Sequence, residues 1–218
     1  MDSFLFPQSN TIYTKICGIK SLQQADAIID LGVDALGFNF YPKSKRYIDP
    51  EEADWLGKLT GKTLRIGVFV NANIDTIRTL IDHDLLDWAQ HGDESPQFVR
   101  NLQDEGWPVF KALGVKDSSS LELAAEYSGP LLLDAYAPTD YGGSGEIMDW
   151  HLGAQAVQRF PEREIILAGG LQPDNVAAAI KQVRPVAVDV ASGVEGEPGE
   201  KDLGLCKQFI ESAEQWNA

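Results

Sequence analysis

Cys17 and Asp134 are the two residues whose places in the sequence best fit acid–base chemistry. Cys17 ends the apolar run Tyr13–Cys17, and an extended strand would put it on the same face as Lys15. A neighbouring ammonium lowers the pKa of a thiol. Asp134 lies near the end of the apolar run Leu131–Ala135, where loss of water would raise the pKa of its carboxyl toward the range of a general acid. A buried structural thiol and a loop-capping carboxylate are the alternatives.

Two glycine-containing turns follow the last two apolar runs of the chain. Ala168-Gly169-Gly170-Leu171 ends one run, and Ala191-Ser192-Gly193 follows the next. Glycine lets backbone N–H groups approach an anion closely, and a helix N-terminus adds a positive dipole. Chain geometry alone would explain either turn, but two in succession favour a phosphate site. We expect the phosphate to be bound by Gly169, Gly170, Ser192 and Gly193.

Other polar side chains end the remaining apolar runs, namely Asn39, Asn71, His91, Lys111 and Asp189. We expect His91, Asp189 and Lys15 to contribute to substrate binding, with a structural role as the alternative for Asp189. Arg46 lies in a loop with Lys43 and Lys45, where its guanidinium could bind a carboxylate through two hydrogen bonds. A solvated charged loop is the alternative for Arg46.

The elements that must position these residues are eight short apolar runs, each followed by a helical pattern. The runs predict buried strands, and their spacing fits one strand–helix unit each. The predicted strands are Tyr13–Cys17, Ala35–Phe40, Leu64–Val70, Leu86–Gln90, Val109–Leu113, Leu131–Ala135, Ile165–Ala168 and Val186–Val190. The predicted helices are Ser21–Leu31, Pro50–Leu59, Asn73–Ile81, Ser95–Gln103, Ser119–Tyr127, Asp149–Phe160, Pro173–Ile180 and Asp202–Trp216.

Eight such units in succession predict an α/β fold, a single-domain (β/α)₈ barrel with its active site at the carboxyl ends of the strands. An open, doubly wound sheet is the alternative, but its dinucleotide form needs G-x-G-x-x-G after the first strand. Gly18-Ile19-Lys20 stands there instead. We expect a short N-terminal tail at 1–11 and the catalytic barrel at 12–218. The segment Tyr141-Gly142-Gly143-Ser144-Gly145 fits either a lid or a plain loop.

Composition excludes several classes of function. The 218 residues carry a net charge of −15, which argues against nucleic-acid or anionic-membrane binding. Two cysteines are too few for a disulfide framework, and we expect Cys206 to pack in the core. No apolar run is long enough for a membrane span, the N-terminus lacks the pattern of a signal peptide, and no Cys/His cluster has zinc spacing. We expect a cytoplasmic protein that is a monomer or a homodimer.

Several stretches, in order along nearly the whole chain, resemble the phosphoribosylanthranilate isomerase family of tryptophan biosynthesis. They include Lys15-Ile16-Cys17-Gly18-Ile19, Ser44-Lys45-Arg46-Tyr47, His91-Gly92-Asp93-Glu94, Gly142-Gly143-Ser144-Gly145, Ala168-Gly169-Gly170-Leu171 and Asp189-Val190-Ala191-Ser192-Gly193-Val194-Glu195. The chain departs from the family at Glu146, where a lysine is common. This change removes a positive contact beside the glycine segment.

The resemblance implies a TIM barrel that needs no cofactor or metal. The implied reaction is an aldose–ketose isomerisation, the Amadori rearrangement of N-(5-phosphoribosyl)anthranilate to 1-(2-carboxyphenylamino)-1-deoxyribulose 5-phosphate. It also implies that Asp134 is the general acid, that Cys17 is the general base and that Arg46 binds the anthranilate carboxylate. The phosphate contacts of the family match the turns at Gly169–Gly170 and Ser192–Gly193.

Two other functions compete with this interpretation. The Amadori isomerase of histidine biosynthesis acts on a related substrate in the same fold, but it has an aspartate where this chain has Cys17. A non-catalytic phosphosugar-binding barrel is the second alternative, and the presence of both Cys17 and Asp134 argues against it. Because the net charge repels an anionic substrate, we expect capture to depend on the local field of Arg46, Lys43, Lys45 and the helix N-termini.

Overall fold

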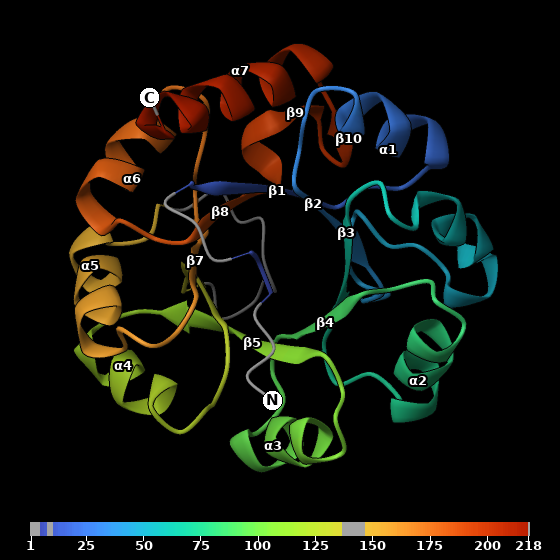
Figure 1. Ribbon diagram of the computed structural model, residues 1–218, viewed down its shortest axis with the longest axis horizontal. Coiled ribbons are helices and arrows are strands. Elements are labelled where there is room, and N and C mark those ends of the chain that lie inside the picture. Colours follow the sequence, from blue (N-terminus) through green and yellow to red (C-terminus); the bar gives the residue numbers. More distant parts are fainter. Residues whose placement is uncertain (1–4, 8–10, 137–146, 218) are drawn as a thin grey trace.

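The computed structural model of the chain describes residues 5–7, 11–136 and 147–217. Eight parallel strands form a closed barrel in the order of the sequence, from β1 round to β8 (Figure 1). They are β1 Tyr13–Cys17, β2 Ala35–Asn39, β3 Leu64–Phe69, β4 Trp88–His91, β5 Val109–Val115, β6 Leu131–Ala135, β7 Ile165–Leu167 and β8 Ala187–Val190. The barrel closes where Tyr13 of β1 pairs with Ala187 of β8. The predicted barrel fold is therefore confirmed.

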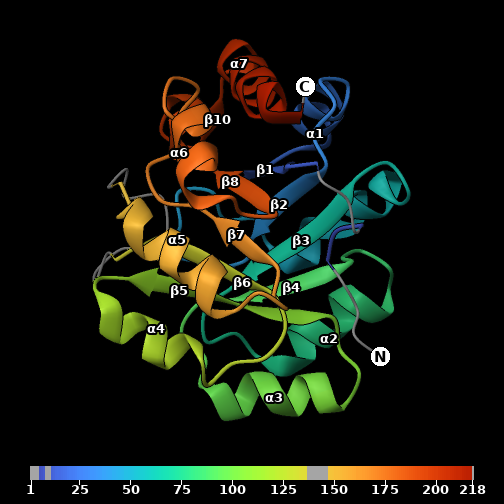
Figure 2. The ribbon, with the colours of Figure 1, turned by 60° about the vertical axis from the view of Figure 1, so that its left-hand side comes forward.

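A ring of helices covers the outside of the barrel, and Figure 2 shows α3 to α6 in this position. The α-helices are α1 Leu22–Ile29, α2 Ile74–Asp82, α3 Pro96–Asp104, α4 Ser118–Ala124, α5 Trp150–Arg159, α6 Val176–Val183 and α7 Leu203–Glu214. Short polar side chains begin most of them: the Ser21 hydroxyl accepts from Gln24 N, and an Asp202 carboxylate oxygen accepts from Leu205 N. None of the helices in the described ranges is long and apolar enough to cross a membrane.

The second helical element, η1 Pro50–Leu59, has its predicted bounds and is a 3₁₀ helix. Its buried residues Ala53, Leu56 and Leu59 recur at every third position. A 3₁₀ helix has three residues per turn, so this spacing keeps all three side chains on one face. The sequence pattern predicts where the element lies, whereas its buried face decides its type.

Several element ends differ from the predicted ones. Helix α6 begins at Val176 instead of Pro173, because Gly170–Asn175 form a turn with its own hydrogen bonds. Strand β5 continues to Val115, two residues beyond its predicted end. After β8 the chain forms the short 3₁₀ helix η2 Ser192–Val194 and an antiparallel hairpin of β9 Glu195–Glu197 and β10 Glu200–Lys201. The apolar pattern does not predict this polar hairpin.

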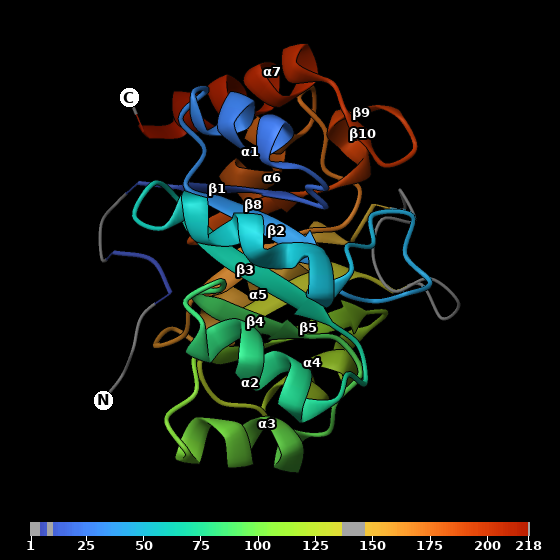
Figure 3. The same cartoon turned by 90° about the vertical axis from the view of Figure 1, so that its right-hand side faces the viewer.

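The two ends of the barrel differ in chemistry. The loop after β2 and the β9–β10 hairpin lie at one end, and the described N-terminal segment 5–7 lies at the other (Figure 3). In this segment Leu5 and Phe6 are 3% and 1% exposed and pack against Ile66, Trp88 and Phe110. The carboxylate of Glu164 accepts hydrogen bonds from both of their backbone N–H groups. The described part of the N-terminal tail therefore closes the barrel at the end opposite the loops that follow the strands.

Candidate active site

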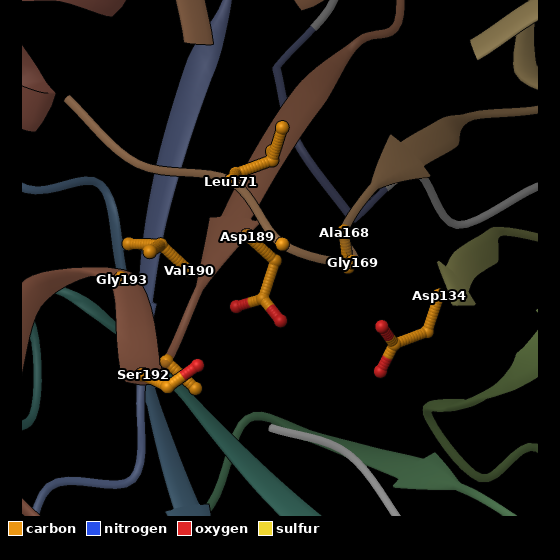
Figure 4. A pocket seen from close by; sticks show the side chains of 10 residues that line it. Asp134, Ala168, Gly169, Leu171, Asp189, Val190, Ser192 and Gly193 are labelled. Atoms are coloured by element: carbon orange, nitrogen blue, oxygen red, sulfur yellow. The ribbon is translucent and has the colours of Figure 1, made fainter. Parts of the chain in front are cut away.

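The candidate site lies at the carboxyl ends of the strands, where residues at the ends of β6 and β8 and the turns after β7 and β8 line one pocket. Figure 4 shows the carboxyl groups of Asp134 and Asp189 pointing into the same space, with Gly169 and Ser192 at its edges. Parallel strands of a barrel all end on one face, so residues far apart in the sequence meet here. Two carboxyl groups beside two backbone turns can combine proton transfer with anion binding.

Asp134 is half-buried at the end of β6, and one of its carboxylate oxygens accepts a hydrogen bond from Ala135 N at 2.8 Å. Burial, together with the negative charge of Asp189, raises the pKa of Asp134 to about 6. At neutral pH a minority of this carboxyl therefore keeps its proton, a far larger share than at the ordinary pKa of an aspartate. Asp134 can donate a proton to a bound molecule.

Cys17 is buried beside an ion pair that links β1 to β8. The Lys15 ammonium lies 2.8 Å from Asp189 Oδ1, and it also interacts electrostatically with the Cys17 thiol. Burial is the largest influence on the pKa of Lys15 and works to lower it, but the interactions with Asp189 and Cys17 together outweigh burial, so the pKa is raised and the ammonium stays charged. Strand alternation places Lys15 and Cys17 together, as the sequence predicts.

The structure contradicts the expectation that the pKa of Cys17 is lowered. Lys15 does lower the pKa of the thiol, but burial raises it by more, so the net pKa lies above the ordinary value for a cysteine. Gly37 of β2 leaves room for the sulfur, since a Cβ atom at Gly37 would lie 2.6 Å from Cys17 Sγ. The thiol is therefore tightly enclosed and neutral when no ligand is bound.

The two turns after β7 and β8 pack directly against each other. Gly169 and Gly170 adopt φ of 82° and 65°, values in the left-handed region that favours glycine. A Cβ atom at Gly193 would collide with the carbonyl oxygen of Leu171. Asn175 holds the first turn, because its amide group donates to Gly170 O at 3.0 Å and accepts from Gln172 N at 2.8 Å. Both turns line the pocket with Asp134 and Asp189.

Arg46 lies beside Cys17 in an ion cluster that involves the β9–β10 hairpin. Its guanidinium donates to both carboxylate oxygens of Glu195, from Nε at 2.6 Å and from Nη2 at 2.8 Å. Lys201 Nζ donates to Glu195 Oε1 at 2.7 Å and to Ala191 O at 2.8 Å. Burial favours the neutral form of Glu195, but the hydrogen bond from Arg46 and those from Gly199 and Lys201 lower its pKa to about 2.

The model of the N-(5'-phosphoribosyl)anthranilate (PRA) isomerase family matches residues 14–212. The chain belongs to the PRA isomerase family. The curated N-(5'-phosphoribosyl)anthranilate isomerase of Trichlorobacter lovleyi is 43% identical over 208 residues, which cover 94% of this chain and 98% of that protein. The protein of the same description from Thermotoga maritima is 44% identical over 205 residues, covering 93% and 98% of the two chains.

Solved structures of this family agree with the barrel described here. The phosphoribosyl anthranilate isomerase of Thermotoga maritima superposes with a TM-score of 0.84 at 41% identity, covering 94% of this chain and all of that one. A structure of a phosphoribosyl anthranilate isomerase in complex with reduced 1-(o-carboxyphenylamino)-1-deoxyribulose 5-phosphate has a TM-score of 0.79 at 38% identity, with coverage of 94% and 100%.

The structure brings some of the predicted residues together and places others behind the site. Asp134, Asp189, Gly169, Gly170, Ser192 and Gly193 line one pocket, and Cys17, Lys15 and Arg46 lie in the ion clusters beside it. His91 has no exposed surface and packs against the rings of Phe69 and Phe98, with Nδ1 3.3 Å from Glu94 Oε1. Residues Tyr141–Gly145 and Glu146 lie outside the described residues.

Other polar residues at the strand ends of this chain hydrogen-bond to neighbouring loops and hold them in place. Asn39 Oδ1 accepts from Tyr41 N, and the Asn71 side chain donates to Asp93. Lys111 Nζ donates to the carbonyl oxygens of Gly92 and Glu94 and lies over the ring of Tyr127. Cys206 is buried in α7, as expected for a core cysteine, and burial raises the pKa of its thiol to about 11.

Three residues at the site were not predicted as functional, namely Asn175, Glu195 and Lys201. Glu195 belongs to a motif that matches the family, yet nothing local in the sequence pairs it with Arg46, which lies 149 positions away. Lys201 follows the turn Pro198-Gly199, a common signal of a hairpin. That signal could have indicated that Lys201 folds back beside Glu195.

Proposed function

We propose that this chain isomerises N-(5-phosphoribosyl)anthranilate in tryptophan biosynthesis, with Asp134 as general acid and Cys17 as general base. The observation that carries the assignment of roles is the contrast between the two groups. Asp134 has a pKa of about 6 and can donate a proton, whereas Cys17 lies in a cluster of cations that offsets part of the cost of a thiolate. Such differently tuned groups divide acid and base roles between them.

In the first step, Asp134 protonates the oxygen of the ribose ring while the bond between that oxygen and C1 breaks. The nitrogen lone pair forms the new C1–N double bond, so the product is an open-chain iminium ion. Burial of Asp134 supports this step, because a carboxyl at the end of an apolar strand keeps its proton nearer to neutral pH than an exposed one.

In the second step, the Cys17 thiolate removes the proton from C2 and the iminium becomes an enolamine. This intermediate tautomerises to the ketone product. The positive iminium favours the thiolate electrostatically, as do Lys15, Lys201 and Arg46. The proton gained by Cys17 balances the proton lost by Asp134, so exchange with solvent restores the enzyme. The enzyme groups transfer protons only, and the bonds that break and form are those of the substrate.

Binding of the substrate uses groups on two sides of the reacting carbons. The turns at Gly169–Gly170 and Ser192–Gly193 receive the phosphate, and Arg46 receives the anthranilate carboxylate. The closely packed turns support the first assignment, since only glycine fits beside Leu171 O at position 193. For an anionic protein, we expect Arg46→Ala to raise KM more than it lowers kcat.

A solved structure describes the Thermotoga maritima isomerase as dimeric. We propose that this chain is a monomer or a homodimer. Cys17 and Cys206 are both free thiols, which supports the expected reducing, cytoplasmic compartment.

The test follows the loss of phosphoribosylanthranilate fluorescence with wild type and two variants. We expect Cys17→Ala and Asp134→Asn each to lower kcat by roughly 10²–10⁴-fold, the usual contribution of a general acid or base, with phosphate-end binding retained. The matched controls are Cys206→Ala, which removes the other buried thiol, and Asp117→Asn, which changes a helix-capping carboxylate. Near-full activity of either site variant would refute its role.

The histidine-pathway isomerase remains the second candidate to test, because it performs the same chemistry in the same fold. Cys17 at the end of β1 argues against it. Assays with both phosphoribosyl substrates separate the two activities, and we expect turnover of the anthranilate substrate alone. A barrel that binds phosphosugars without catalysis would turn over neither.

A further inference from the structure

Glu195 is almost fully buried, and four donors occupy its two carboxylate oxygens. Oε1 accepts from Arg46 Nε at 2.6 Å and from Lys201 Nζ at 2.7 Å, and Oε2 accepts from Arg46 Nη2 at 2.8 Å and from Gly199 N at 2.9 Å. With two donors on each oxygen, the carboxylate has no acceptor site left for a substrate. Any effect of Glu195 on a substrate therefore acts through the groups that it holds.

The two hydrogen bonds from Arg46 to Glu195 fix the plane of the Arg46 guanidinium. Glu195 uses the edge formed by Nε and Nη2, and within the described residues Nη1 donates no hydrogen bond. Because the guanidinium is rigid and planar, holding one edge fixes the direction of the other. The free edge can then meet a second carboxylate in the same plane.

The aliphatic part of Arg46 is held as well, because it lies across the backbone of Gly18. A Cβ atom at Gly18 would collide with Arg46 Cδ, and Gly18 has φ of 89°. Gly18 directly follows Cys17, so this packing keeps the guanidinium beside the thiol. The positive charge of Arg46 accordingly acts on Cys17. Both ends of the arginine side chain are therefore fixed relative to the base.

Lys201 extends this arrangement to the turn after β8. Its fully buried ammonium bridges Glu195 Oε1 and the carbonyl oxygen of Ala191, which comes directly before Ser192 and Gly193. The residue that holds Arg46 is thus tied to a turn that lines the pocket. The distance between the arginine and that turn is set by one carboxylate and one ammonium.

We propose that Glu195 is a positioning residue for the substrate's aromatic carboxylate: it presents the free edge of Arg46 to that group and, through Lys201, fixes its distance from the phosphate turns. The inference rests on the proposed function, which gives Arg46 the carboxylate and the turns the phosphate. It adds that selection for a carboxylated aromatic ring depends on a residue that does not touch the ligand.

A purely structural role for Glu195 predicts a different result. If Glu195 only stabilised the β9–β10 hairpin, its loss would weaken every ligand of the site to the same degree. A positioning role makes the loss specific for ligands that carry the carboxylate. The ratio of two affinities separates these cases, because a partly unfolded variant weakens both ligands equally and leaves their ratio unchanged.

The experiment measures Kd for two unreactive ligands, the reduced product and the same compound without its ring carboxyl group. For Glu195→Gln we expect a loss of roughly tenfold to a hundredfold for the carboxylated ligand, the range for charged hydrogen bonds, and less than about threefold for the other. Glu195→Asp keeps the charge, but its side chain is too short to hold both Arg46 and Lys201, and we expect the same pattern. Glu122→Gln breaks the matched surface pair with Arg159 and should change neither Kd.

Arg46→Met separates failure of this inference from failure of the proposed function. We expect Arg46→Met to remove the preference for the carboxylated ligand. If it does so while the Glu195 variants keep the wild-type preference, the positioning role is overturned and the role of Arg46 stands. If Arg46→Met also keeps the preference, the proposed carboxylate contact is wrong and the inference falls with it.

Discussion

At the scale of single residues, the site depends on how burial and charge act on two groups that start from very different pKa values. Burial raises the pKa of both Asp134 and Cys17, since each is neutral when protonated. For Asp134 this creates a proton donor near neutral pH. For Cys17 it opposes the thiolate, and Lys15, Lys201 and Arg46 offset only part of the cost. The acid therefore has a lower pKa than the base.

This order of pKa values predicts an unusual assignment for the pH profile. The active enzyme needs protonated Asp134 together with ionised Cys17. Because the acid has the lower pKa, only a minority of the molecules carry this combination at any pH. Its population rises with pH up to about 6, stays level up to the raised pKa of Cys17 and falls above it. The lower limb of kcat/KM near pH 6 therefore reports Asp134, although Asp134 is the acid.

Asp189→Asn tests this assignment, because the charge of Asp189 contributes to the raised pKa of Asp134. We expect the lower limb of kcat/KM to move to a more acidic pH in this variant, as the carboxyl loses its proton more readily. The asparagine can still accept a hydrogen bond from Lys15. A lower limb that stays near pH 6 would show that another group titrates there.

The sequence predicts the residues at strand ends better than the residues that support them. Cys17 and Asp134 each lie at or near the end of an apolar run, so the pattern of apolar runs places them at the active end of a barrel. Glu195 and Lys201 lie in a short polar hairpin without any apolar pattern. Their role depends on contacts with Arg46 and Ala191, and such contacts exist only after the barrel has closed.

At the scale of elements, the strands follow from apolar runs, whereas helix type and helix ends depend on packing and local hydrogen bonds. The element Pro50–Leu59 begins at its predicted residue, where Asp49 caps it, and its buried residues Ala53, Leu56 and Leu59 recur at the three-residue spacing of a 3₁₀ helix. The late start of α6 follows from the side chain of Asn175, which holds the preceding turn. Local patterns do not contain this information.

Arg65 of β3 offers an element-scale prediction for stability, because it ties its strand to the segment between α2 and β4. Its buried guanidinium donates to Thr60, to the carboxylate of Asp87 and to both the carboxylate and the carbonyl oxygen of Asp84. We expect Arg65→Met to lower the free energy of unfolding by about 1–3 kcal/mol, since buried acceptors lose a charged partner.

The measurement for Arg65→Met is urea unfolding followed by circular dichroism, together with kcat/KM at 25 °C. We expect kcat/KM to stay at the wild-type value, because none of the hydrogen-bond partners of Arg65 lines the candidate site. Arg78→Met is the matched control, since its exposed pair with Asp75 should contribute little. An unchanged unfolding midpoint in Arg65→Met would contradict the expectation.

At the scale of the whole molecule, stability and chemistry are separated along the barrel axis. The loops after the strands carry the candidate site, and Leu5 and Phe6 fill the opposite end of the barrel. The family match begins at residue 14, after this segment. The sequence predicts that 1–11 is a tail outside the repeating strand–helix units. The three consecutive apolar residues in this tail, Phe4, Leu5 and Phe6, do not by themselves indicate where they pack. Contact with the barrel interior settles that for Leu5 and Phe6.

Removal of residues 1–10 is therefore expected to lower stability without changing turnover. Docking buries two large apolar side chains and satisfies two N–H groups through Glu164, but it also orders the backbone. These opposing terms leave a net contribution of about 1–3 kcal/mol, and hence a drop in Tm of a few degrees. Phe6→Ala cannot lower the free energy of unfolding by more than this, because a weakened segment can detach from the barrel. Ile66→Ala instead leaves a cavity in the barrel itself, which lowers the free energy of unfolding by about 2–5 kcal/mol.

Calorimetry of the three variants should give the smallest Tm shift for Phe6→Ala and the largest for Ile66→Ala, with kcat/KM of the truncated chain at the wild-type value. Loss of kcat/KM on truncation with Tm unchanged would show that the segment serves the chemistry and not the fold.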